Sequence, residues 1–182
     1  VGKSQFVLSV AVLLALGAPT IFGFTNTFAG QPKKSIIYNA EDSMQEMSKR
    51  VYAFCDFHRY DPARVLPYLS LTSGKDFSLS IATGGSIVQR TETDDQHIGY
   101  LVSAALDPEV VMVSLDPLSK VHTGNPNDNR DMNIVMSVLS WIAARADVAL
   151  IVPAHTSKPG LASSTGYAGN VNSILGATAV AD

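Results

Sequence analysis

The stretch Val110–Asp116, VVMVSLD, constrains the fold more than any other part of the chain. Five of its seven residues are apolar, which is typical of a strand buried on both faces of a parallel sheet. Asp116 closes the run, and Pro117, which cannot continue a ladder of backbone hydrogen bonds, follows it. In open α/β sheets ligands bind at the carboxyl ends of the strands. Asp116 therefore either caps a turn or helps to hold a metal ion beside a phosphate.

Strand-like and helix-like stretches alternate along the rest of the chain. The apolar spacing of a helix is found in residues 3–16, 43–57, 91–106 and 130–146. Strand-like runs occupy residues 35–40, 77–82 and 147–154. This alternation predicts an α/β fold, a three-layer α/β/α domain with a mainly parallel sheet that needs further strands at both ends to be complete. With no internal repeat and no linker, we expect a single domain over residues 1–182.

Local signals refine this outline. Thr93 is the predicted N-cap of the helix at 91–106, and Gly17 is the predicted C-cap of the helix at 3–16. Residues 56–74 are predicted to form one or two surface helices, with no chemistry assigned to them.

The composition limits the classes of function. With 182 residues, of which 46% are apolar and 16% charged, the chain can bury a real core and is not disordered. The net charge of -3 indicates no basic surface, so nucleic acid binding has to be argued from a site. The single cysteine, Cys55, permits no internal disulfide and fits a reducing, cytoplasmic compartment.

The first residues allow two interpretations. Gly2-Lys3-Ser4 matches the end of the phosphate-binding loop G-x-x-x-x-G-K-[ST] and would open a helix. The amides of Gly2 to Gln5 would then face a phosphate, Lys3 would reach the β- and γ-oxygens, and the Ser4 hydroxyl would bind Mg²⁺. Alternatively, residues 1–30 form a secretory signal that ends in small residues. A membrane span is not expected, because glycine, proline and polar residues interrupt the run before the roughly 20 residues needed.

Two further polar groups follow predicted strands. Glu41 and Asp42 lie between a strand and a helix: either Asp42 caps the helix and Glu41 favours its dipole, or Glu41 is a general base that polarises water toward a γ-phosphate. His155 follows the strand at 147–154 and is either a structural hydrogen-bonding residue or part of the site. Since parallel strands share one carboxyl edge, we expect Lys3, Glu41, Asp116 and His155 to converge there, as phosphoryl transfer requires.

The order of these motifs resembles a known family. The motifs that carry the similarity are, in order, GKS, NAED, VVMVSLDPLSKVHTGNPNDNRDM and IVPAHTSKPG. The chain is similar to the RecA-like ATPase domain of RepA-type hexameric plasmid helicases and their AAA-type relatives. The resemblance implies a RecA-like sheet with ATP and Mg²⁺ as cofactors. It implies Lys3 and Ser4 on the nucleotide and Mg²⁺, Asp116 as the Walker B acid, Glu41 as the catalytic base and His155 as the γ-phosphate sensor. It also implies a hexameric ring and single-stranded DNA bound by the loop after His155.

The chain also departs from that family's pattern. The front of the phosphate-binding loop is not present, residues 175–178 read LGAT where relatives often have RGSS, and the arginine finger would lie beyond Asp182. We therefore expect this stretch by itself to hydrolyse ATP poorly, although the intact protein hydrolyses it. The functions considered are an ATP-driven DNA helicase, an ATPase that acts as a recombination mediator or switch without unwinding, and a secreted binding protein.

Overall fold

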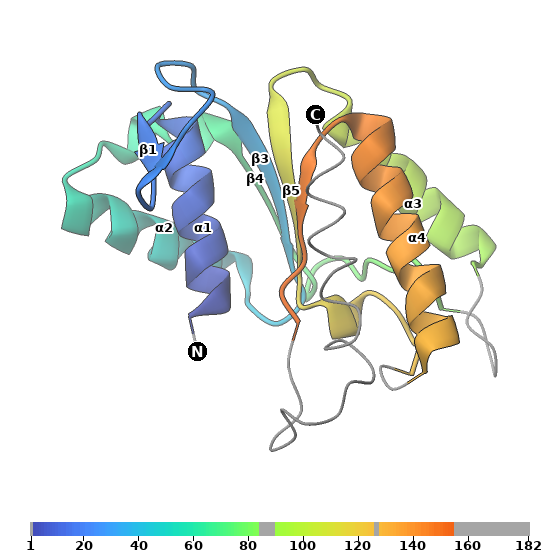
Figure 1. Ribbon diagram of the computed structural model, residues 1–182. Helices are drawn as coiled ribbons and strands as arrows, with labels where there is room; N and C mark the ends of the chain where they lie inside the picture. Colours follow the sequence, from blue (N-terminus) through green and yellow to red (C-terminus); the bar gives the residue numbers. More distant parts are fainter. Residues whose placement is uncertain (1, 84–89, 126–127, 155–182) are drawn as a thin grey trace, which may run out of the picture.

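The computed structural model of the protein describes residues 2–83, 90–125 and 128–154. Its middle layer is a four-stranded parallel sheet with the strand order β4-β3-β5-β6. The strands are β3 (Lys34–Asn39), β4 (Leu69–Ser73), β5 (Val110–Asp116) and β6 (Ala149–Ile151). One face is covered by α1 (Lys3–Ala15) and α2 (Met44–His58), and the other by α3 (Glu92–Ala105) and α4 (Asn129–Ala146) (Figure 1). This three-layer α/β/α arrangement confirms the predicted fold class.

Short elements connect these layers. A small antiparallel hairpin lies between α1 and β3 and is formed by β1 (Thr20–Ile21) and β2 (Phe24–Thr25). Single 3-10 turns are η1 (Pro62–Arg64), η2 (Leu66–Tyr68) and η3 (Leu118–Lys120). In the described ranges, no helix has both the length and the apolar character needed to cross a bilayer.

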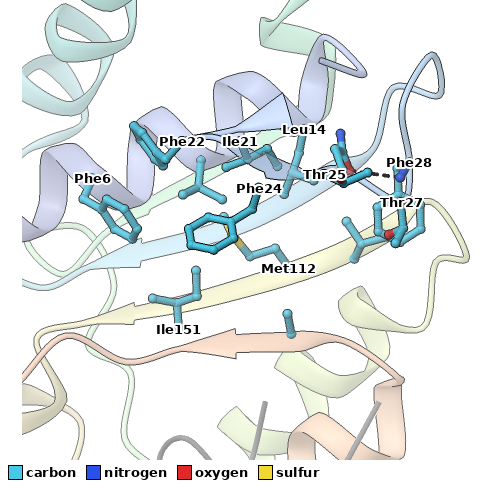
Figure 2. A pocket seen from close by; sticks show the side chains of 14 residues that line it. Phe6, Leu14, Ile21, Phe22, Phe24, Thr25, Thr27, Phe28, Met112 and Ile151 are labelled. Carbon is cyan, nitrogen blue, oxygen red and sulfur yellow. Dashed lines mark hydrogen bonds between the residues drawn. The ribbon is translucent and has the colours of Figure 1, made fainter. Parts of the chain in front are cut away.

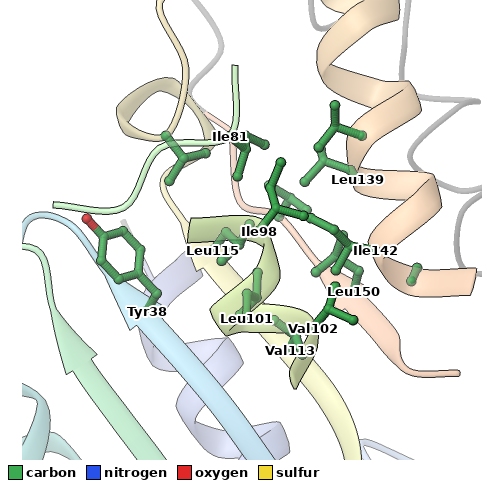
Figure 3. Packing of buried hydrophobic residues seen from close by; sticks show 14 of the residues in the cluster. Tyr38, Ile81, Ile98, Leu101, Val102, Val113, Leu115, Leu139, Ile142 and Leu150 are labelled. Carbon is green, nitrogen blue, oxygen red and sulfur yellow. The ribbon is translucent and has the colours of Figure 1, made fainter. Parts of the chain in front are cut away.

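Alternate side chains of the strands enter two different cores. Ile36 and Tyr38 of β3 pack in the larger core with α3 and α4, whereas Ile37 packs in the smaller core with α1 and α2. This division follows from the two-residue period of a strand. Figure 3 shows the larger core, in which Leu115 of β5 lies among side chains from α3, α4 and β6. Cys55 of α2 is buried in the smaller core.

Helix α1 is buried on several sides, as predicted for a helix in a crowded α/β core. Its buried residues are Val7, Leu8, Ser9, Ala11, Val12, Leu14 and Ala15. The helix is capped by Leu16, one residue before the predicted Gly17. Gly17 has φ +59°, and a Cβ there would lie 2.8 Å from the backbone nitrogen of Gln31, so glycine is required. Residues 3–15 therefore form part of the core, as the interpretation of this segment as a core helix predicts.

Side-chain oxygens cap three of the helices. Ser43 accepts a hydrogen bond from the backbone N–H of Glu46 at the start of α2, and Asp128 accepts one from Arg130 at the start of α4. The cap of α3 is Thr91 and not the predicted Thr93. A cap needs extended backbone and an acceptor that faces the first turn, and Thr93 is already inside the helix.

Two predictions between α2 and α3 were wrong in part. Residues 69–73 form β4, a strand that the prediction of surface helices for 56–74 omitted. Residues 77–82 are not a strand, although Ala82 makes an isolated bridge with His122. The backbone N–H of Leu79 donates to the Tyr38 hydroxyl and that of Ser80 to His97, so side chains take the place of a strand ladder.

A buried carboxylate joins that irregular segment to α3. Asp94 is fully buried and accepts hydrogen bonds from the backbone and side chain of Thr83 and of Thr91, at 2.8 to 3.0 Å. Burial alone would raise the pKa of Asp94, but hydrogen bonds from Ser80, Thr91 and Thr83 outweigh it and lower the pKa to about 2. The ionised form of Asp94 therefore stabilises the fold.

We expect Asp94→Asn to lower the free energy of unfolding at pH 7 by about 2–3 kcal/mol, because the amide cannot accept all of these hydrogen bonds. The contribution of the carboxylate is complete above the ordinary pKa near 3.8 and is lost as the pH falls toward about 2. Urea denaturation between pH 7 and pH 2 measures both effects. Asp95→Asn, at an exposed neighbour, is the matched control, and an equal loss in both variants would contradict the account.

Candidate functional site

Two neighbouring strands and one helix meet at the carboxyl edge of the sheet. β3 ends at Asn39 and β5 at Asp116, and these two residues are partners in the parallel ladder. α1 begins at the same edge, where the Lys3 ammonium donates a hydrogen bond to the carbonyl of Ala154, just after β6. Ligands of open α/β sheets bind at this edge.

Among the described residues, no side chain caps the N-terminus of α1. Gly2 is the N-cap residue with φ +99°, a conformation that favours glycine. The first turn contains no acidic residue. Since the first N–H groups of a helix lack internal partners and carry the positive end of its dipole, this terminus suits an anion such as a phosphate.

Asp116 lies beside this terminus and is only 5% exposed. Burial raises the pKa of its carboxyl above the ordinary value, and the charges of Glu41 and Asp42 act in the same direction. Hydrogen bonding from the Ser4 hydroxyl and the charge of Lys3 lower the pKa and oppose these effects. Lys3, Ser4 and Glu41 are therefore each close enough to act on Asp116.

The two acids that follow β3 are held in different ways. Asn39, which is 4% exposed, accepts hydrogen bonds from the backbone N–H groups of Glu41 at 2.9 Å and Asp42 at 2.8 Å. Its side-chain nitrogen lies 3.2 Å from Asp42 Oδ2 and 3.3 Å from Asp116 Oδ2. Asn39 thus connects the loop that carries both acids to the end of β5.

Arg50 of α2 fixes the second acid. Its guanidinium contacts both oxygens of Asp42, with Nη1 to Oδ2 at 2.9 Å and Nη2 to Oδ1 at 3.2 Å. The Ser73 hydroxyl donates to the backbone carbonyl of Asp42 at 2.8 Å. Ser43 and not Asp42 caps α2, so the structure does not support the alternative in which Asp42 is the cap. The Glu41 side chain is exposed at the same edge.

The family model described as an AAA domain matches residues 1–160. This chain belongs to the AAA domain family. Comparison with curated proteins gives no match. Membership indicates a P-loop ATPase domain, and the unpaired N–H groups at the α1 terminus agree with this class.

In this AAA domain most of the predicted site residues gather at one edge. Gly2 is the N-cap residue of α1, and its first turn contains Lys3, Ser4 and Gln5. Glu41 follows β3, and Asp116 is the last residue of β5. The predicted sensor, His155, lies outside the described residues, as does the loop after it. The sequence analysis missed Asn39 and Arg50. The only sequence signal for Asn39 was its position as a polar residue at the end of an apolar strand. No local pattern indicated Arg50.

The donors at this edge fit a magnesium ion that is shared with a nucleotide. In the described part of the chain, no three His, Cys, Asp or Glu side chains form a group that could hold a metal by themselves. Mg²⁺ in nucleotide sites is usually held by one or two protein oxygens, with phosphates and water completing its octahedron. The Ser4 hydroxyl and the buried Asp116 carboxylate of the AAA domain are donors of this kind.

The AAA domain also has an apolar hollow of about 400 Å³ away from these charges. Figure 2 shows it between α1, the β1–β2 hairpin and the sheet, with Phe6, Phe22, Phe24 and Ile151 around it. The rings of Phe6 and Phe22 stack at 5.1 Å between centroids. None of the lining residues is ionisable. This hollow therefore offers no side-chain acid or base for the chemistry of the site.

A close backbone contact supports the Glu41 loop. A Cβ added to Gly74 would lie 2.5 Å from the Cα of Ala40, and the Gly74 N–H donates to the Asn39 carbonyl at 2.7 Å. Gly74→Ala should lower the free energy of unfolding by about 1–3 kcal/mol, because backbone has to move. Gly99→Ala is the control, since its Cβ meets nothing within 4 Å, and it should raise stability by about 0.5–1 kcal/mol. Thermal unfolding compares the two, and a stable Gly74→Ala would contradict the close approach.

Proposed function

We propose that this AAA domain binds ATP with Mg²⁺ at the N-terminus of α1 and hydrolyses it. The observation that carries the proposal is that Lys3 and Ser4, in the first turn of an uncapped helix, lie beside the buried Asp116 carboxylate. An anion site and a cation site next to each other suit a triphosphate and its magnesium ion. The membership of the AAA domain family supports the same nucleotide class.

Each residue has a distinct role in this proposal. The backbone N–H groups at the start of α1 hold the β-phosphate, and Lys3 exchanges the Ala154 carbonyl for the β- and γ-oxygens. Ser4 and Asp116 would hold Mg²⁺, which would supply positive charge to the phosphates. Glu41, exposed at the same edge, orients a water molecule toward the γ-phosphate and accepts its proton.

The different contacts of the Glu41 and Asp42 carboxylates support Glu41 as the base. Asp42 has both carboxylate oxygens engaged by Arg50 and one of them also by Asn39, so it holds the loop. In the described ranges no hydrogen bond or ion pair joins the Glu41 carboxylate to another side chain. Glu41 is therefore available to a water molecule, whereas Asp42 is not.

Glu41→Gln should reduce ATP hydrolysis by the full-length protein at least about 100-fold, because the amide accepts no proton from water. Nucleotide affinity should stay within about threefold, since Glu41 does not hold the phosphates in this proposal. Steady-state turnover and titration with a fluorescent ADP analogue give the two quantities. Lys3→Ala is the reference variant and should lose both. A loss of nucleotide affinity in Glu41→Gln would assign Glu41 to binding or to structure instead.

We further propose that hydrolysis drives movement on single-stranded DNA within a hexameric ring of a cytoplasmic, RepA-like helicase. The support is the order of motifs over the whole chain, in particular DPLSKVH, NDN and HTSK, together with the AAA domain match. DNA would contact the loop after His155, which lies outside the described residues. In such a ring the neighbouring subunit would supply the arginine finger.

The net charge of -3 favours a second candidate, an ATPase that acts as a mediator or switch without unwinding. Unwinding of a forked DNA duplex by the full-length protein separates the two. Strand separation that needs ATP and is lost in Lys3→Ala supports the helicase. ATP hydrolysis without strand separation supports the mediator or switch.

A further inference from the structure

The Asn39 side chain occupies the centre of the candidate site. It lies at the last position of β3, opposite Asp116 in the ladder, and is 4% exposed. It makes four hydrogen bonds, two to the backbone of the Glu41 loop and two to carboxylates. These bonds use both N–H groups and both acceptor positions of the amide.

The chemistry of the partners fixes the orientation of this amide. The backbone N–H groups of Glu41 and Asp42 can only donate, so the side-chain oxygen of Asn39 has to face them. The carboxylates of Asp42 and Asp116 can only accept when ionised, so the side-chain nitrogen has to face those. An aspartate at this position would keep the first pair of bonds and lose the second.

The side-chain oxygen of Asn39, its acceptor half, and the side-chain nitrogen, its donor half, have different effects. The acceptor half folds the chain from Asn39 to Asp42 into a local turn, a role that aspartate fills equally well. The donor half joins that turn to Asp116, which is 77 residues away in sequence. The backbone N–H of Ala40 also donates to the Asp116 carbonyl at 2.7 Å, but that bond does not reach the Asp116 carboxylate, which the donor half of Asn39 contacts.

The far side of the loop is anchored separately. Arg50 holds Asp42 from α2, and Ser73 holds the Asp42 carbonyl from β4. With these contacts in place, the loop keeps its place against α2 and β4 even without Asn39. The donor half of Asn39 is therefore the side-chain contact that orients the Asp116 carboxylate relative to this loop.

We propose that Asn39 is a positioning residue for ATP hydrolysis, whose side-chain N–H groups hold the Glu41 loop against Asp116. This inference rests on the proposed function, in which Glu41 acts on water and Asp116 binds Mg²⁺. In this proposal Asn39 contacts neither the nucleotide nor the attacking water. It acts through the two acids, so its loss should slow turnover more than it weakens nucleotide binding.

The test compares Asn39→Asp and Asn39→Ala in the full-length protein. Asn39→Asp keeps the side-chain volume and the acceptor half, and Asn39→Ala removes both halves. We expect kcat for ATP to fall at least about tenfold in both, with KM within about threefold of the wild-type value. Ser114→Ala is the matched control, because Ser114 is fully buried on the same strand as Asp116 and its hydroxyl has no hydrogen-bond partner among the described residues. Its kcat should be unchanged.

Two results would overturn the inference. Wild-type kcat in Asn39→Asp would show that the turn alone matters, and a rise in KM with unchanged kcat would place Asn39 in nucleotide binding. Urea denaturation shows whether each variant is folded, and if Asn39→Ala is not, the isosteric Asn39→Asp decides. The proposed function fails by a different result, namely a wild-type protein without ATP hydrolysis or one in which Lys3→Ala hydrolyses ATP normally.

Discussion

The parallel pairing of β3 with β5 is the constraint on which the rest of the structure depends. It places Asn39 directly opposite Asp116, so the loop after one strand and the last residue of the other share one edge of the sheet. α1 packs on one face of the sheet and begins at this edge. Separate pieces of sequence thus bring a helix N-terminus, a lysine, a hydroxyl and three carboxylates together without any one segment containing them all.

Charge is balanced unevenly within this group. Arg50 neutralises Asp42, whereas Asp116 is buried near two other carboxylates and has a raised pKa. Lys3 and Ser4 offset this only in part. A site of this kind gains from a bound cation, and the positive end of α1 gains from a bound anion. A magnesium nucleotide supplies both, which is the physical reason why the fold and the AAA domain family lead to the same proposal.

The parts of the fold that sequence reasoning predicted are those with a strong apolar pattern. The buried run at 110–116 became β5 with the same bounds, and α4 began within one residue of its predicted start. β4 was missed because its five residues alternate apolar and polar side chains after two proline-containing turns, which resembles surface structure. Residues 77–82 have the composition of a strand, but tertiary hydrogen bonds to Tyr38 and His97 determine their path.

The candidate site was also predictable only in part from the sequence. A residue at the end of a strand can be assigned to the carboxyl edge from sequence, which is how Glu41 and Asp116 were found. The contacts of Asn39 and Arg50 depend on the register between strands and on the packing of α2, and neither is visible in a local pattern.

The most direct measurement is a crystal structure of the full-length protein with Mg²⁺ and a non-hydrolysable ATP analogue. The account predicts phosphates at the first turn of α1, the Lys3 ammonium moved from the Ala154 carbonyl to phosphate oxygens, and Mg²⁺ between Ser4 and Asp116. Phosphates bound at any other place, with Lys3 still on Ala154, would contradict it.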